Sequence, residues 1–133
     1  MLKKFTNKKG FTLMEMLIVV AIIAILVAIA IPTFSGSLAK ANAATDLANI
    51  RSGFASAQIK AMTETVADST KLYLQKDGSV ELTATNAYEC KGKNDDVSGA
   101  NEIGGKGFTV TWNKGDKITY TINGGQVTAI TKE

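Results

Sequence analysis

No residue from Met16 to Ile31 carries a polar side chain, and a glutamate, Glu15, directly precedes this run. Four lysines stand before Gly10, on the other side of the glutamate. As a helix, residues 11–34 would measure roughly 36 Å, enough to cross a hydrocarbon core of about 30 Å once. Lysines favour the cytoplasmic side, so we expect the rest of the chain outside. The helix would then carry a carboxylate near its cytoplasmic end, and this charge raises the free energy of inserting the helix into the membrane.

A basic stretch followed by an apolar one is also typical of a secretory signal peptide. Here the small residue Gly10 precedes the apolar run instead of following it. Residues 32–37 continue into a helical pattern, without an Ala-x-Ala site in a polar setting. We therefore expect the apolar segment to be retained. Pro32 removes one helical hydrogen bond and is expected to kink the helix where it leaves the bilayer.

The junction closely resembles the class III signal of type IV pilins and pseudopilins. The resemblance covers about residues 8–35 and rests on Gly10, Phe11, Glu15 four residues later and Pro32 after the apolar run. It implies leader cleavage after Gly10 by a prepilin peptidase, and N-methylation of Phe11 as the new first residue. It also implies that Glu15 serves assembly and that Pro32 bends the helix. Physically, the free amine of Phe11 on a neighbouring subunit would offset the burial of the Glu15 carboxylate.

The charge distribution argues against a nucleic-acid surface. The sequence has 15 cationic and 12 anionic side chains, and the four lysines before Gly10 account for the excess. The remaining chain is close to neutral and has little electrostatic attraction for nucleic acid. It contains no histidine and a single cysteine, so an internal disulfide is excluded and the commonest catalytic base and metal ligand are missing. We expect no enzyme, no cofactor and no metal.

Beyond the apolar run, residues 35–68 are predicted to form an amphipathic helix that ends near residues 67–70. One face has the larger side chains and is expected to pack on the chain's own sheet. A second, alanine-rich face is favoured for contacts with neighbours, although both faces could instead be buried in one domain. Gly36 and Gly53 lower helix propensity, so local melting or bending is plausible there. The first face comprises Ala43, Leu47, Ile50, Phe54, Ala57 and Ala61, and the second Ala44, Ala48, Ala55, Ile59, Met62 and Val66.

The C-terminal half has the pattern of a small antiparallel sheet. Apolar residues flank Asp77-Gly78, which predicts a hairpin between residues 72–74 and 80–82. Alternating patterns predict a meander of three further strands, over residues 108–112, 118–122 and 127–131. With the helix, this predicts an α+β fold. The threonine-rich face of the meander is expected to face solvent.

Residues 86–107 lack periodicity and are interpreted as an exposed loop. Asn94, Asp95, Asp96, Asn101 and Glu102 could offer oxygen ligands to calcium, but their spacing does not fit the EF-hand, and a solvated acidic loop is favoured. Cys90 is interpreted as a tucked-in, inert thiol. Many pilins of diderm bacteria close a loop with two cysteines, whereas this chain is closer to the cysteine-poor pilins of monoderm bacteria.

Four segments are therefore expected: a leader over residues 1–10, a transmembrane and filament-core helix over 11–34, an amphipathic helix over 35–68, and a β-rich head over 69–133. The resemblance implies a homo-oligomeric helical filament for adhesion or motility, served by prepilin peptidase, an assembly ATPase and a membrane platform protein. The precursor would be a single-pass protein of the cytoplasmic membrane, and the filament a pilus on the cell surface. The alternatives are a pseudopilin of a type II secretion or DNA-uptake apparatus and a membrane-anchored binding module.

Overall fold

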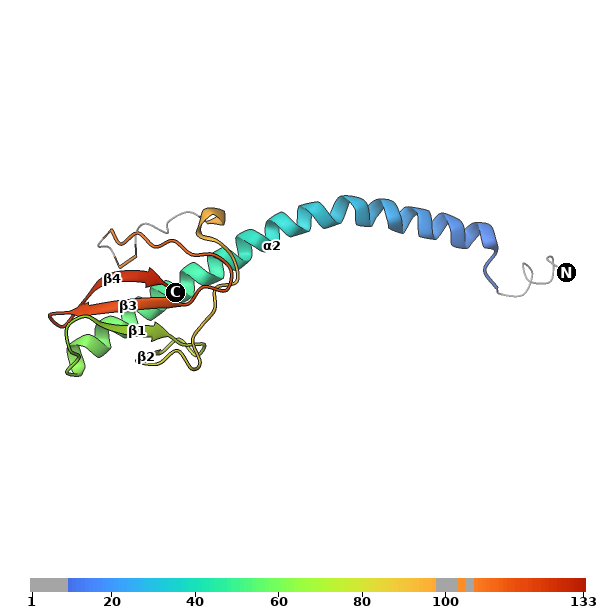
Figure 1. The fold of residues 1–133 in the computed structure, drawn as a ribbon. Coiled ribbons are helices and arrows are strands. Elements are labelled where there is room, and N and C mark those ends of the chain that lie inside the picture. Colours follow the sequence, from blue (N-terminus) through green and yellow to red (C-terminus); the bar gives the residue numbers. More distant parts are fainter. Residues whose placement is uncertain (1–9, 98–102, 105–106) are drawn as a thin grey trace. The chain divides into compact units, whose positions relative to one another are not determined.

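A computed structural model describes residues 10–97, 103–104 and 107–133 of the chain. Contacts divide it into two compact units, Met1–Ser37 and Leu38–Glu133. The elements, in chain order, are helix α2 (Leu13–Thr63), strands β1 (Thr70–Leu74) and β2 (Val80–Glu81), the 3-10 turn η1 (Asn94–Asp96), and strands β3 (Ile118–Asn123) and β4 (Gln126–Lys132) (Figure 1). The α+β prediction is confirmed, with one long helix and one small antiparallel sheet.

In the first unit, the described residues form the first part of α2 and the three residues before it. The large apolar side chains from Phe11 to Phe34 are between 45% and 79% exposed. Among the described residues, α2 is the one helix that is long and apolar enough to cross a membrane. The helix continues through Pro32, and the predicted kink stays a prediction.

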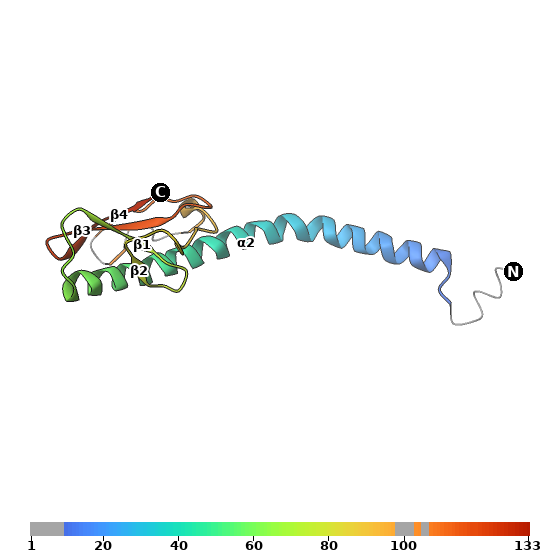
Figure 2. The same ribbon diagram turned by 60° about the horizontal axis from the view of Figure 1, so that its bottom comes forward.

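In the second unit, α2 lies along one face of the sheet (Figures 1 and 2). The predicted packing face is confirmed, because five of its residues are buried and Phe54 packs against the core at its edge. The alanine-rich face is exposed at its five positions within α2. The helix ends at Thr63, a few residues before the expected 67–70.

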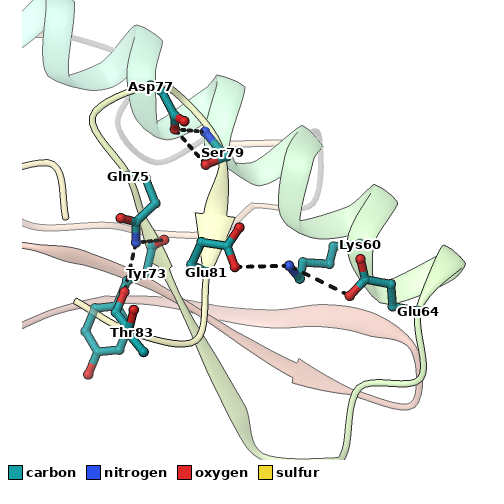
Figure 3. A network of polar contacts seen from close by, with 8 residues as sticks. All are labelled: Lys60, Glu64, Tyr73, Gln75, Asp77, Ser79, Glu81 and Thr83. Carbon is teal, nitrogen blue, oxygen red and sulfur yellow. Dashed lines mark hydrogen bonds and ion pairs between the residues drawn. The ribbon is translucent and has the colours of Figure 1, made fainter. Parts of the chain in front are cut away.

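The sheet has the strand order β2-β1-β3-β4, and all neighbouring strands are antiparallel. The predicted hairpin is confirmed, with Leu74 opposite Val80. Its turn is held by Asp77, whose carboxylate accepts hydrogen bonds from the Ser79 hydroxyl at 2.6 Å and amide at 3.0 Å (Figure 3). These two bonds lower the pKa of Asp77. The same hairpin contacts α2 through Lys60, whose ammonium lies 3.5 Å from the Glu81 carboxylate (Figure 3).

The predicted strand over residues 108–112 is wrong. Only Phe108 forms an isolated bridge, with Ile103, and β1 takes the place beside β3 instead. The inward side chains Val110 and Trp112 are nevertheless fully buried. The Trp112 amide donates to the Asn94 side chain at 3.0 Å, and the Trp112 carbonyl accepts from the Asn94 amide at 3.3 Å. These contacts with one residue, and not a strand ladder, hold this end of the segment. Apolar alternation thus identified the core residues but not the backbone pairing.

Other expectations were also wrong in part. Thr119, on the face expected to be solvated, is buried, and its hydroxyl lies 2.6 Å from that of Thr131. Residues 87–92 are not an exposed loop either, since Ala87, Tyr88 and Cys90 are buried. The predicted burial of Cys90 is confirmed, whereas its inertness stays a prediction. Burial, followed by the charges of two nearby aspartates, raises the pKa of this thiol to about 12.

Asp46 explains why the segment over residues 87–92 packs against the helix. This carboxylate is fully buried on α2 and accepts five hydrogen bonds. Oδ1 accepts from the Tyr88 hydroxyl at 2.6 Å and Oδ2 from the Trp112 indole at 3.0 Å. The amides of Lys91 (2.8 and 3.0 Å) and Gly92 (2.7 Å) supply the other three. A buried carboxylate is tolerated when its oxygens are satisfied in this way, and here it ties the loop and the tryptophan to the helix.

Gly53 has a packing role that the helix pattern did not show. A Cβ at this position would lie 2.6 Å from a Leu74 methyl and closer still to the Tyr120 hydroxyl, which donates to the Ile50 carbonyl at 2.7 Å. The expected melting at Gly53 is wrong, because α2 is continuous there and the missing side chain admits Tyr120. Around Gly36, by contrast, nothing lies within 4 Å of a Cβ.

We expect Asp46→Ala to destabilise the head by at least about 3 kcal/mol, since each buried donor left without an acceptor costs roughly 1–3 kcal/mol. Asp46→Asn keeps one acceptor oxygen and should lose less. The measurement is urea unfolding of the full chain in detergent micelles, followed by the fluorescence of Trp112, the only tryptophan. Asp95→Asn, at an exposed position, is the control. Equal stability of Asp46→Ala and the control would contradict the role assigned to Asp46.

We expect Gly53→Ala to destabilise the head by about 1–3 kcal/mol through overpacking against Tyr120 and Leu74, although alanine is the better helix former. The matched variant Gly36→Ala places its methyl group in open space and should leave unfolding of the head unchanged. The same unfolding assay compares the two. A more stable Gly53→Ala variant would show that the close approach of Tyr120 is unimportant.

Candidate functional site

The candidate site is the start of α2. Gly10, Phe11 and Thr12 precede the first helical residue and are not part of any helix or strand. Gly10 is exposed, and the Phe11 side chain is 79% exposed. The peptide bond between Gly10 and Phe11 therefore lies in exposed, non-helical backbone, which is the form of chain that a peptidase can bind.

Glu15 lies in the first turn of α2 and forms a reciprocal pair of hydrogen bonds with Thr12. The Thr12 amide donates to Glu15 Oε2 at 2.9 Å, and the Glu15 amide donates to Thr12 Oγ1 at 3.1 Å. This is a capping box, in which the two side chains satisfy two amides that have no partner within the helix. A carboxylate in the first turn is also stabilised by the positive end of the helix dipole.

The structure brings three of the four predicted site residues together. Gly10, Phe11 and Glu15 line one open hollow with Met16 and Val19. Pro32 lies further along α2 and is not part of this hollow. One carboxylate therefore faces a largely apolar recess beside the predicted cleavage point. Among the described residues, only Thr12 hydrogen-bonds to the Glu15 carboxylate, through Oε2.

Thr12 is the residue that our sequence reasoning missed. Its signal was present, because Thr12-Leu13-Met14-Glu15 directly before an apolar run is the sequence signature of a capping box. The glutamate had been explained only through a partner on a neighbouring subunit. In the structure it already has an intrachain function, which is to begin the helix.

The described residues of the loop considered for calcium give no further site. Asn94 is engaged, since its side chain accepts from the Trp112 amide and donates to Asp95 at 3.1 Å. Asn101 and Glu102 lie outside the described residues. Within the described parts of the chain, no three acidic or cysteine side chains gather where they could hold a metal ion.

A family model describes the start of the chain. Residues 5–31 match the prokaryotic N-terminal methylation motif, and they cover the end of the basic stretch, the candidate site and the apolar run. No solved structure matches the fold of this chain significantly.

We expect Thr12→Val to loosen the first turn of α2, because valine cannot accept the hydrogen bond from the Glu15 amide. Loss of an N-cap side chain costs about 1 kcal/mol, which corresponds to roughly fivefold faster exchange of the Glu15 amide hydrogen. Hydrogen exchange by NMR in micelles measures this, with Thr12→Ser as the conservative control that keeps the acceptor. Unchanged exchange in Thr12→Val would rule out the capping box.

Proposed function

We propose that this chain, which carries the class III signal of the type IV pilin and pseudopilin family, is a structural subunit of a type IV pilus. The motif supports a pilin-like precursor and implies processing by prepilin peptidase and polymerisation into filaments. With the apolar helix, it fits a single-pass membrane precursor that is assembled into surface filaments. The family is structural and not enzymatic.

The observation that carries the proposal is the exposure of the apolar part of α2. Its large side chains are exposed on all sides from Leu13 to Phe34. Such a surface is stable in lipid, or among other apolar helices, but not in water. The membrane supplies such an apolar environment to the precursor, and the packed helices of a filament core supply it after assembly. We therefore propose that the segment over residues 11–34 becomes part of the core of a pilus.

Leaving the membrane gives this helix little hydrophobic gain, because lipid tails are as apolar as neighbouring side chains. Extraction therefore needs work from outside the subunit. We assign that work to an assembly ATPase and a membrane platform protein. The proposed filament then gains its cohesion from close packing of apolar helices and from polar pairs within the core.

At the candidate site, we propose cleavage between Gly10 and Phe11 and methylation of the new Phe11 amine. The Glu15 carboxylate would then pair with the Phe11 ammonium of a neighbouring subunit. The capping box is compatible with this pairing, since it uses one carboxylate oxygen, Oε2. The second oxygen can accept from the neighbour, and the buried charge is then satisfied by two partners.

The head over residues 69–133 would form the outer surface of the filament, attached through the later part of α2, which ends at Thr63. The exposed alanine-rich face of that helix supports contacts with neighbouring subunits, because small residues permit close approach. We propose that Pro32 bends the helix between the apolar segment and the segment that carries the head.

Substitutions of Glu15 test the proposed charge pairing. Glutamine can replace glutamate in a capping box but carries no charge, so Glu15→Gln keeps the cap and loses the ion pair. We expect the amount of sheared filament to fall at least about tenfold, since a buried ammonium without its counter-charge is heavily penalised. Membrane levels of the cleaved chain should be unchanged, and Glu89→Gln, at an exposed position of the head, should assemble normally.

Mass spectrometry of the sheared fraction tests the function itself. A pilus subunit should be abundant there and should begin at methylated Phe11. A chain that retains residues 1–10 in filaments would contradict the processing, and wild-type assembly of Glu15→Gln would contradict the pairing. A chain confined to the membrane fraction, with no filament, would instead favour a pseudopilin or an anchored module.

A further inference from the structure

The turn between β3 and β4 contains the sequence Asn123-Gly124, the only asparagine–glycine pair in the chain. At such a pair, the glycine nitrogen can attack the asparagine side-chain amide carbon and close a five-membered succinimide. Glycine permits this because no Cβ obstructs the approach. Gly124 has a φ of 60°, and nothing lies within 4 Å of the position that a Cβ would take.

A carboxylate contacts the attacking nitrogen. The Gly124 amide donates a hydrogen bond to Asp68 Oδ1 at 2.8 Å, across the end of the sheet. The hydrogen in this bond is the one that the nitrogen must lose during ring closure. A carboxylate within hydrogen-bond reach of such a hydrogen is placed to act as a general base. Both residues are exposed, so water has access.

The amide group under attack is held from both sides. The Ser69 amide donates to Asn123 Oδ1 at 2.8 Å, where negative charge develops during the attack. Asn123 Nδ2, the leaving nitrogen, donates to the Thr128 hydroxyl at 3.0 Å.

Ser69 has an unusual backbone. Its φ of 64° makes it the one non-glycine residue with a left-handed backbone among those that the structure describes. This conformation is costly and has to be maintained by surrounding contacts. It places one amide within 2.8 Å of both the Ile122 carbonyl and the Asn123 side chain.

We propose that Asn123 is a self-modification site, at which Asp68 and Ser69 promote deamidation. The bond between Gly124 N and Asn123 Cγ forms, and the bond between Cγ and Nδ2 breaks. The Gly124 proton passes to Asp68 and then to the departing nitrogen, which leaves as ammonia. Water opens the succinimide at either carbonyl and gives aspartate or isoaspartate at position 123. Nothing is oxidised or reduced.

The product changes the surface of the head. Either product adds a negative charge in the turn that Asp68 contacts, and the amide donor to Thr128 is lost. Isoaspartate also lengthens the backbone of the turn by one atom. The modification would accumulate with age on an exposed turn, and it does not depend on whether the chain forms a pilus.

The test uses the full chain in detergent micelles at neutral pH and 37 °C. Peptide mapping by mass spectrometry follows the loss of Asn123 over time, in the folded chain and in the chain unfolded in urea. We expect the folded chain to react at least about tenfold faster, a conservative figure for a positioned base. We expect Asp68→Asn to remove this acceleration and Asp95→Asn, at an exposed position, to retain it.

Two results would overturn the proposal. If Asn123 reacts no faster in the folded chain than in the unfolded one, the contacts only restrain the side chain. If Asp68→Asn folds and reacts as fast as the wild type, Asp68 is not the base. The comparison of folded and unfolded wild type needs no variant, so it decides the proposal even if Asp68→Asn fails to fold.

Discussion

The structure depends on one long helix whose two parts must be buried in different ways. The first part of α2 exposes large apolar side chains on all sides, whereas the later part buries one face against the sheet and leaves the other in solvent. The hydrophobic effect acts on both parts, but it is satisfied by other molecules in the first and by the chain's own strands in the second. The head therefore has a core of its own, whereas the apolar part requires lipid or neighbouring subunits.

Two carboxylates on this helix illustrate the consequence. Asp46 is fully buried and receives five hydrogen bonds from its own chain, so it needs no further partner. Glu15 is exposed in the single chain and receives one hydrogen bond at Oε2, from Thr12. A carboxylate satisfied internally holds a fold together. One that keeps an oxygen available at the end of an apolar helix can hold one subunit to the next, which is the role proposed for Glu15.

Periodicity predicted those parts of the fold in which side-chain burial alone determines the backbone. The packing face of α2 followed from 3.6-residue spacing, and β3 and β4 followed from alternation around glycine turns. The segment over residues 108–112 alternates equally well, yet it is not a strand. Its position is fixed by hydrogen bonds from Trp112 to Asn94 and Asp46, and such contacts between distant residues leave no local pattern. Gly53 could not be interpreted from local sequence either, because its role is to leave space for the side chain of Tyr120, which is distant in sequence.

The start of α2 was predictable because its chemistry is local. Gly10, Phe11 and Glu15 lie within six residues, and the capping box uses only neighbours along the chain. Thr12 was harder to predict, because a charge at the end of an apolar helix accounts for Glu15 without any partner in its own turn. The two roles support each other. A helix whose first turn is fixed by Thr12 and Glu15 holds the carboxylate in one orientation, so less entropy is lost when a neighbouring ammonium binds it. Capping within the subunit and the proposed pairing between subunits would thus be two uses of a single preorganised group.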